Sequence, residues 1–245
     1  MNKFHSFFLL LVVLNFKGMA QDSLPVRAKT FIVSDKPKDH FILQFGYVSW
    51  LNKPDSIATA GFSRSIGIYL MYDLGFKTDP RFSVGAGIGV GSDHVFFDEN
   101  AGRDLVINNA SGFQFKKHTG ADTENKYNSM KLHTAYLDIP LELRFMHRPE
   151  KPNKSFKVAI GVKGGLLLTA VDKTSYERDG LGNGSYTMKI KDTRHFNSLR
   201  FAGTARIGYG NFGAFVQYQL NDLINEGRGP NQIRPLIIGI TLSGL

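Results

Sequence analysis

The stretch Arg81–Gly91 alternates apolar residues with serine or glycine, and this two-residue period constrains the fold more than any other feature of the chain. Phenylalanine, valine, alanine and isoleucine fall on one parity, whereas Ser83 and four glycines fall on the other. Because successive side chains of a strand point to opposite faces, one face would be apolar and the other nearly bare. The stretch therefore predicts a strand that lies between two very different surroundings.

Similar alternation recurs along the chain and predicts an all-β fold. The chain has no cysteine, which excludes a disulfide framework and any cysteine-based metal or redox site. We expect an eight-stranded antiparallel up-and-down β-barrel. Its expected strands are 41–51, 65–76, 81–91, 132–146, 156–170, 199–209, 212–220 and 233–242.

The N-terminal residues have the composition of a secretory signal peptide. Lys3 precedes the apolar run Phe7–Phe16, and the small residues Gly18 and Ala20 precede an expected cleavage site at Gln21. A buried N-terminal helix is the alternative. No later apolar run reaches the roughly 18 residues of a membrane-spanning helix, which excludes a helical membrane protein. The predicted division of the chain is a signal peptide at 1–20, a periplasmic N-terminal segment at 21–39 and a barrel at 40–245.

The predicted connections alternate between short and long. Short turns occupy 77–81, 147–155 and 210–211, whereas 92–131 and 171–198 are very long connections. A soluble antiparallel sandwich also contains alternating strands, but it does not require this asymmetry. Short periplasmic turns and long extracellular loops are typical of outer-membrane barrels, so the sequence favours a transmembrane barrel.

Aromatic residues on the apolar parity flank each short turn. Membrane barrels carry such girdles at the interfaces between lipid and water. We therefore expect the apolar parity to face lipid. The predicted girdle consists of Phe76, Phe82, Phe145, Phe156, Tyr209 and Phe212.

The opposite parity is small or charged, and it would face the barrel interior. A soluble core does not hold many unpaired charges, and the interior of an eight-stranded barrel is just wide enough for side chains to fill. We expect ion pairs to fill the lumen, with the glycines of 81–91 leaving room for Glu142 and Arg144. The predicted polar network of the lumen consists of Asp73, Asp138, Glu142, Arg144, Lys163, Arg200 and Arg206.

Two places interrupt the strand pattern. Pro140 removes a donor from the middle of its strand, which predicts a bulge. Tyr186, Met188 and Ile190 alternate on a parity that disagrees with strand 199–209. A bulge or break between residues 191 and 197 would reconcile the two.

The segment Tyr136–Phe145, with the sequence YLDIPLELRF, resembles the Y-L-x-I-P-L-x-L strand of the PorT-like outer-membrane β-barrel family. The resemblance implies an eight-stranded outer-membrane barrel. It also implies an association with protein secretion, which is known for the founding member. It supplies no catalytic residues and no cofactor.

Three histidines lie near a candidate catalytic partner at the expected outer rim. A nucleophile requires a base within hydrogen-bond reach and a third group that orients the base. Polar loop residues explain the three pairs equally well, and we predict no catalytic residue. The pairs are His94 with Asp93, His133 with Ser129, and His195 with Ser198.

Asp98, Asn100, Gly102 and Asp104 have part of the oxygen spacing of a calcium loop. Asn109 stands where a bidentate glutamate would complete such a site, so an acidic turn is the better interpretation. No metal and no cofactor are predicted.

The expected outer loops are basic, and the whole chain has a formal net charge of +9. An exported basic protein meets lipid phosphates rather than nucleic acid, and lipopolysaccharide is the partner that this charge suits. A solvated surface is the alternative. The basic residues are Lys116, Lys117, Lys126, Lys131, Lys173, Lys189, Lys191 and Arg194.

These observations favour a non-enzymatic structural or interaction protein of the outer membrane, with envelope lipid and an envelope or secretion protein as its expected partners. Three alternatives stay open. They are a lipid-modifying barrel enzyme, a small-molecule channel, and a soluble secreted barrel with its apolar face inward.

Overall fold

The computed structural model describes residues 41–54, 57, 59, 61–97, 103–108, 112–117, 125–178, 185–230 and 232–244. These residues form strands and a single 3-10 turn, η3 (Pro152–Lys154). No helix among them is long and apolar enough to cross a membrane. The strands are β1 (Phe41–Leu51), β2 (Arg64–Gly75), β3 (Phe82–Phe97), β4 (Arg103–Asn108), β5 (Gly112–Lys117), β6 (Asn125–Met146), β7 (Phe156–Arg178), β8 (Ser185–Lys191), β9 (Leu199–Tyr209), β10 (Phe212–Gln219) and β11 (Arg234–Ser243).

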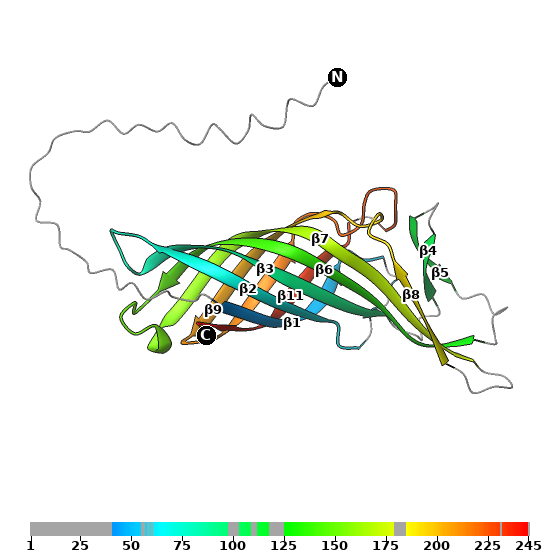
Figure 1. The fold of residues 1–245 in the computed structure, drawn as a ribbon, viewed down its shortest axis with the longest axis horizontal. Helices are drawn as coiled ribbons and strands as arrows, with labels where there is room; N and C mark the ends of the chain where they lie inside the picture. The colour runs from blue at the N-terminus through cyan, green and yellow to red at the C-terminus, as the bar shows by residue number, and fades with distance from the viewer. Residues whose placement is uncertain are drawn as a thin grey trace, which may run out of the picture. The chain divides into compact units, whose positions relative to one another are not determined.

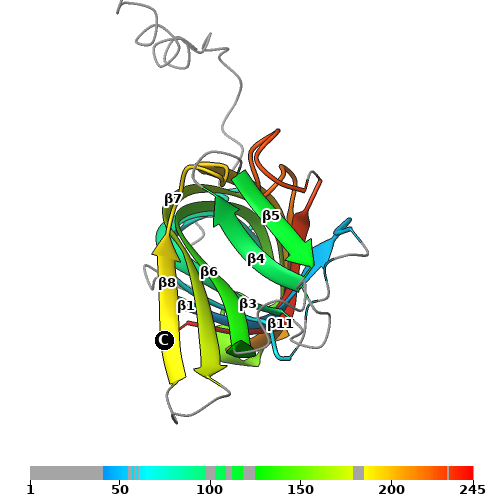
Figure 2. The same cartoon turned by 90° about the vertical axis from the view of Figure 1, so that its right-hand side faces the viewer.

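Eight of these strands close into an antiparallel barrel (Figures 1 and 2). Their order around the wall is β6-β3-β2-β1-β11-β10-β9-β7, and β7 pairs back onto β6. The strand β8 extends the sheet by pairing with the far part of β7, whereas β4 and β5 form a separate two-stranded sheet. Closure leaves the barrel wall without an edge that could recruit another chain. The predicted eight-stranded barrel is therefore confirmed.

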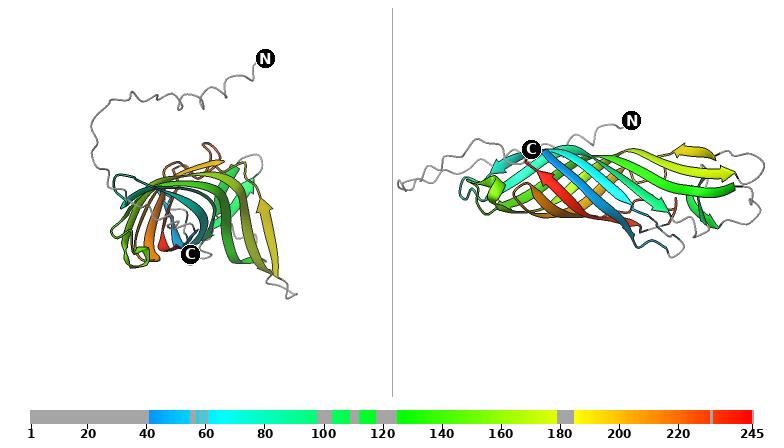
Figure 3. Two further views of the ribbon diagram at one scale, coloured as in Figure 1. Left: turned by 60° about the vertical axis from the view of Figure 1, so that its left-hand side comes forward. Right: turned by 90° about the horizontal axis from the view of Figure 1, so that it is seen from below.

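The strands run obliquely along the barrel, and three of them are longer than the sequence predicts (Figure 3). β3, β6 and β7 each extend at the end from which the long connections leave, here called the long-loop end. The apolar alternation stops there because the outward positions become polar, as at Ser92, His94 and Lys131. A strand prediction that follows apolar periodicity therefore ends too early.

The apolar parity faces outward. Ile88, Leu141 and Ile238 are 50%, 49% and 56% exposed, whereas Glu142 and Arg206 on the other parity are 6% and 9% exposed. A contiguous apolar outer surface with charges enclosed is the arrangement of a barrel that has lipid as its solvent. We define the apolar belt by its outward residues at 82–90 on β3, 137–145 on β6 and 156–168 on β7.

Aromatic side chains collect at the opposite end, here called the short-turn end. Tyr209 pairs with both Phe156 and Phe212 on neighbouring strands. The rings of Phe82 and Phe145 lie 5.2 Å apart between centroids. Phe76, on the outward face after β2, is also exposed. The six residues that the sequence assigns to a girdle therefore lie at one end of the barrel.

Pro140 does not produce the bulge predicted for its strand. Ala86 pairs with Leu141 and Gly89 pairs with Asp138, so β3 and β6 keep one register on both sides of the proline. A proline removes a donor from the ladder but adds no residue to the strand. The ladder is interrupted here without a shift, and the prediction of a bulge at this position was wrong.

A register shift occurs instead next to Ala135, where β7 has one extra residue opposite β6. On the belt side of the shift Leu166 pairs with Leu137, and beyond it Lys173 pairs with Lys131. The outward parity of β7 therefore changes from even to odd residue numbers. This change turns Lys173 to the outer face.

The predicted break between residues 191 and 197 is present. The strand β8 ends at Lys191 and β9 begins at Leu199, and both pair with β7. The intervening segment leaves the wall and meets the β10–β11 connection, where Phe196 forms an isolated bridge with Ile224. The break does not change the parity, because Lys189 of β8 pairs with the outward Lys173, so odd-numbered residues face outward on β8 as they do on β9.

A charge placed on the middle of the outer face tests the orientation of the wall. We expect Ile139→Arg to destabilise the barrel in lipid vesicles by about 2–4 kcal/mol, because an arginine at the bilayer midplane loses its hydration. The matched variant Tyr209→Arg, at the short-turn end, should cost about 0–1 kcal/mol because a charge near the interface reaches water. Urea unfolding in vesicles measures both values. Equal costs at the two positions would contradict the assigned membrane depth.

Candidate functional site in the barrel interior

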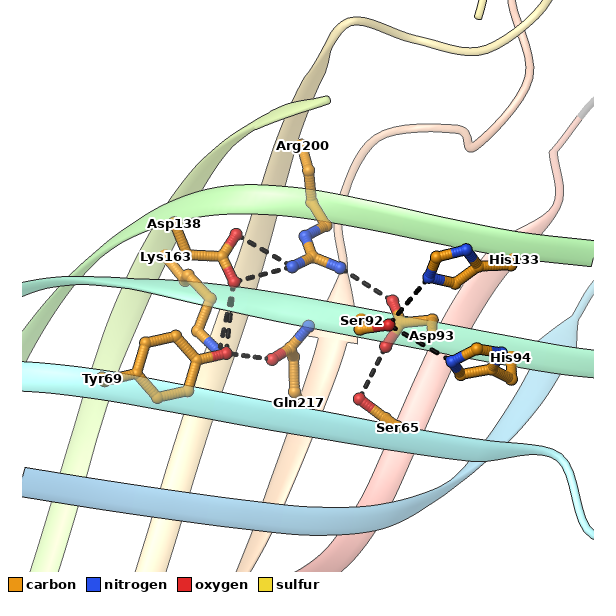
Figure 4. Close-up of polar contacts among 10 residues, drawn as sticks. All are labelled: Ser65, Tyr69, Ser92, Asp93, His94, His133, Asp138, Lys163, Arg200 and Gln217. Carbon is orange, nitrogen blue, oxygen red and sulfur yellow. Dashed lines mark hydrogen bonds and ion pairs between the residues drawn. The ribbon is translucent and has the colours of Figure 1, made fainter. Parts of the chain in front are cut away.

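Arg200 on β9 joins two carboxylates inside the barrel (Figure 4). Its Nη2 donates to the Oδ1 and Oδ2 atoms of Asp138 at 2.8 and 2.7 Å, and its Nη1 donates to Asp93 Oδ2 at 2.9 Å. The Oγ of Ser65 donates to the other oxygen of Asp93 at 2.6 Å. The side chains of Arg200 and Asp138 are at most 1% exposed. Neighbouring protein groups, rather than water, therefore compensate these charges.

Tyr69 and Lys163 extend this group across the lumen. The hydroxyl of Tyr69 donates to Asp138 Oδ2 at 3.1 Å and accepts from Lys163 Nζ at 2.8 Å. Lys163 Nζ also donates to Gln217 Oε1 at 2.7 Å. These residues come from β2, β6, β7 and β10, so the bonds connect strands that are not neighbours in the wall.

A second charged group is centred on Glu142. Its Oε2 accepts from Arg206 Nη2 at 2.6 Å and from Arg144 Nε at 3.0 Å. Arg144 Nη1 also lies 3.6 Å from Asp73 Oδ1. With the first group, the interior holds four carboxylates and four basic side chains in contact, so their formal charges cancel.

The structure brings together all seven residues that the sequence assigns to the lumen, and it adds Asp93. The sequence already indicates that Asp93 faces the interior, because Asp93 has the same parity as the glycines of β3. Its proximity to His94 in the sequence instead suggested a catalytic pair. The side chains of neighbouring strand residues point to opposite faces, which separates the two groups.

Glycines make room for these large charged side chains. A Cβ on Gly85 would lie 2.6 Å from Arg144 Cζ, and a Cβ on Gly91 would lie 2.8 Å from Asp138 Oδ2. The expected space beside β3 therefore accommodates Arg144. For Glu142 the close glycine is Gly161 on β7, whose Cβ would lie 3.0 Å from the Glu142 Cγ atom.

An apolar plug reaches from the long-loop end into the middle of the interior, where its residues Phe215 and Ile237 pair with Arg206 and Gln217 beside the charged groups. Inward residues of the strand ends pack there with residues of the connections between strands. The plug differs from the lumen predicted from the sequence, in which all inward residues are polar or small. We define it by Val48, Trp50, Ile57, Val95, Phe97, Met130, Leu132, Ala170, Phe196, Phe215, Leu223, Ile224, Ile233 and Ile237.

Polar contacts join the connections that contribute to the plug. Asn197 Nδ2 donates to the carbonyl of Asp222 at 2.6 Å. Asn225 Nδ2 donates to the carbonyls of Arg194 and Phe196 at 3.0 and 3.1 Å. The β8–β9 and β10–β11 connections are thereby held together over the barrel mouth.

The described residues line one small interior cavity at the short-turn end, with a volume of about 40 Å³. Asp73, Arg144 and Arg206 contribute to its wall. This volume accommodates about three water molecules. A larger recess of about 680 Å³ is lined by outward side chains such as Leu141 and Val162, so it belongs to the lipid-facing surface rather than to the lumen.

Two of the three candidate pairs, His94 with Asp93 and His195 with Ser198, are not assembled in the described part of the chain. Asp93 faces the interior and binds Arg200, whereas His94 faces outward. His195 is buried with its Nε2 atom 3.5 Å from Asp192 Oδ2, whereas Ser198 is exposed. The side chain of Ser129 lies outside the described part.

The structure instead brings His133 and His94 together on the outer face. Their rings stack with centroids 4.3 Å apart, and the Oγ of Ser92 lies 2.9 Å from His133 Nε2 and 3.3 Å from His94 Nε2. Among the described side chains, no carboxylate contacts either imidazole, and no three potential ligands gather as a metal site requires. The residues that resemble a calcium loop lie outside the described side chains.

The family comparison agrees with this architecture. A family model described as outer membrane protein beta-barrel domain matches residues 39–225. No curated protein compared with the chain matches it significantly. The match covers well over half of the sequence and includes most of the closed wall. The chain therefore belongs to the outer membrane β-barrel domain family, and the outer membrane is the location that this family implies.

Proposed function

We propose that the chain is a non-enzymatic structural or interaction protein of the envelope, built on a barrel with a sealed lumen. The observation that carries the proposal is that two packed groups of side chains fill the barrel interior. One is the charge-neutral group around Arg200 and Glu142, and the other is the apolar plug. A conducting pore needs a continuous wet path, which neither group provides.

The resemblance to the PorT-like family supports a role beside a secretion or envelope protein. In this proposal the barrel wall serves as an anchor, and the connections at the long-loop end supply the contacts with a partner. Fold alone does not assign such a role, because one fold hosts many functions. Co-purification from envelope membranes in mild detergent would identify the partner.

Electrical recordings test the sealed lumen. We expect the purified chain in planar bilayers to show conductance at the background level, because the two packed groups of side chains fill the interior. Insertion is confirmed on the same material by protection of the barrel from protease. Stepwise conductance from inserted barrels would contradict the proposal and favour a small-molecule channel.

The competing function is that of a lipid-modifying enzyme, and the contact between Ser92 and His133 makes it worth testing. A serine nucleophile needs a base that is itself oriented by a third group, whereas among the described side chains His94 only stacks on the ring of His133 and no hydrogen bond other than that with Ser92 orients it. Alanine variants of His94, His133 and His195 should therefore leave the lipid A composition of the envelope unchanged. A change in acyl chain number in any of them, seen by mass spectrometry, would favour the enzyme.

A further inference from the structure

A row of basic side chains crosses the outer face just beyond the apolar belt. Lys131 on β6 pairs directly with Lys173 on β7, and Lys173 pairs directly with Lys189 on β8. Like charges placed opposite each other on neighbouring strands repel and destabilise a sheet. Three lysines in register across three strands therefore form a surface that is more stable when an anion is bound.

Aromatic rings hold the edge of this row in place. Phe96 on β3 pairs with Lys131, whose Nζ lies 5.7 Å from the centre of the Phe96 ring. The guanidinium of Arg64 lies 5.5 Å from the centre of the same ring. A ring face attracts two cations that would otherwise separate. Arg64 and Lys131 thus remain close despite their repulsion.

No carboxylate neutralises these cations within the described part of the chain. The ion pairs of the described residues involve neither Arg64 nor Lys131, Lys173 or Lys189. Burial, followed by repulsion from Lys173, Arg64 and Lys189, lowers the pKa of Lys131. Arg64, Lys173 and Lys189 therefore each lie within electrostatic range of Lys131. In the barrel interior, by contrast, basic and acidic side chains match.

Beside the row, the stacked imidazoles add polar groups without adding charge. Burial, followed by the neighbouring His133, lowers the pKa of His94 to about 4, and burial also lowers the pKa of His133. Both rings are therefore neutral at pH 7 and can donate or accept hydrogen bonds. His94 follows Val90, the last belt residue of β3, by four positions on the same face. That spacing corresponds to about 13 Å along the strand, beyond the hydrocarbon edge where headgroups lie.

We propose that Arg64, Lys131, Lys173 and Lys189, together with His94 and His133, form a binding site for the phosphate of an outer-leaflet lipid. The acyl chains of the lipid would lie against the belt residues of β3, β6 and β7 directly below the site. Basic side chains bind phosphate through charge-assisted hydrogen bonds, and the four positive charges suit a phosphate monoester. This assignment rests on the proposed membrane anchor and gives it a specific lipid contact.

Native mass spectrometry of the full chain in an uncharged detergent tests the site with phosphatidic acid as the probe. Each basic side chain near a lipid phosphate contributes roughly a fivefold factor in affinity. We therefore expect Lys131→Gln/Lys173→Gln to weaken retention of phosphatidic acid by about 25-fold. The matched double variant Lys151→Gln/Lys154→Gln removes two exposed lysines from the β6–β7 turn at the other end, and should retain the lipid like the parent. Equal retention by the parent and Lys131→Gln/Lys173→Gln would overturn the site.

Two further probes identify the source of the phosphate. Diacylglycerol, which lacks the phosphate, should not be retained. Inorganic phosphate at the concentration of the lipid should not displace it, because the acyl chains contribute to binding. Equal displacement by inorganic phosphate would show a site for free anions and overturn the assignment to lipid.

Unfolding of the same variants separates binding from a structural role. Without added lipid, Lys131→Gln/Lys173→Gln should be at least as stable as the parent because it removes cross-strand repulsion. If this double variant were less stable than the parent, the proposed repulsion between the lysines of the row would be refuted. The conductance test is independent of this site. A sealed barrel that does not retain phosphatidic acid refutes the lipid site alone, and a conducting barrel that retains it refutes the sealed lumen alone.

Discussion

Replacement of Arg200 by methionine is expected to destabilise the barrel by about 3–5 kcal/mol. The substitution keeps an unbranched side chain in the lumen but leaves Asp138 and Asp93 buried without their common partner. An unpaired buried charge costs more than the pair itself contributes, because the remaining carboxylates cannot recover their hydration. Urea unfolding of the barrel in lipid vesicles, followed by tryptophan fluorescence, measures the change.

Two further variants isolate the cause. In Arg200→Met/Asp93→Asn one charge of each sign is removed and Asp138 keeps Lys163 Nζ at 4.0 Å, so we expect a large part of the lost stability to return. Arg81→Met removes an arginine whose ion pair with Asp79 has a similar length of 2.7 Å but whose two side chains are 52% and 32% exposed. A surface pair of this kind is worth about 0–1 kcal/mol. If Arg200→Met cost no more than Arg81→Met, the interior group would not hold the barrel together.

The sequence predicts the wall of this barrel well because lipid and lumen impose opposite demands on alternate residues. Each strand carries that contrast in its own residues, as Phe82 and Ser83 do at the start of β3. The charged lumen follows from the same parity. Four basic and four acidic side chains enclosed by a wall must meet, whatever the loops do.

The partners of each charge were beyond the sequence, because they depend on the register between strands distant in the chain. Arg200 reaches Asp93 across 107 positions, and no local pattern sets that contact. The shift beside Ala135 is a second example, since one extra residue in β7 moves Lys173 to the outer face. A parity count carried through that strand without the shift assigns Lys173 to the lumen.

The apolar plug was missed for a different reason. Its strand residues Val48, Trp50, Val95 and Phe97 continue the inward parity, but they change its chemistry from polar to apolar. The predicted strand 81–91 ended before this change in β3, whereas the predicted strand 41–51 included it in β1 without assigning the inward residues to an apolar core. The sequence does contain a signal for the plug, since residues of the same parity change from polar to apolar along one strand. It predicts a barrel whose interior has separate polar and apolar layers.

Trp50 tests the apolar layer, and we expect Trp50→Ala to destabilise the barrel by about 3–5 kcal/mol. The indole is 3% exposed and meets the ring of Phe97 edge-on, with centroids 5.4 Å apart. Its removal leaves a cavity among residues that the wall holds apart, so the plug cannot collapse to fill it. Thermal unfolding in detergent micelles gives the size of the loss.

Phe62 supplies the matched control, because it is an exposed aromatic residue before β2 that stacks on Phe45 at 6.0 Å. Phe62→Ala loses mainly these ring contacts and should cost about 1 kcal/mol. The conductance of Trp50→Ala should nevertheless stay at background, since the charged group around Arg200 still fills its part of the lumen. A variant that conducts would show that the plug is the only seal, whereas one as stable as Phe62→Ala would show that the plug is loosely packed. A destabilised but sealed barrel is the result that two independent layers require.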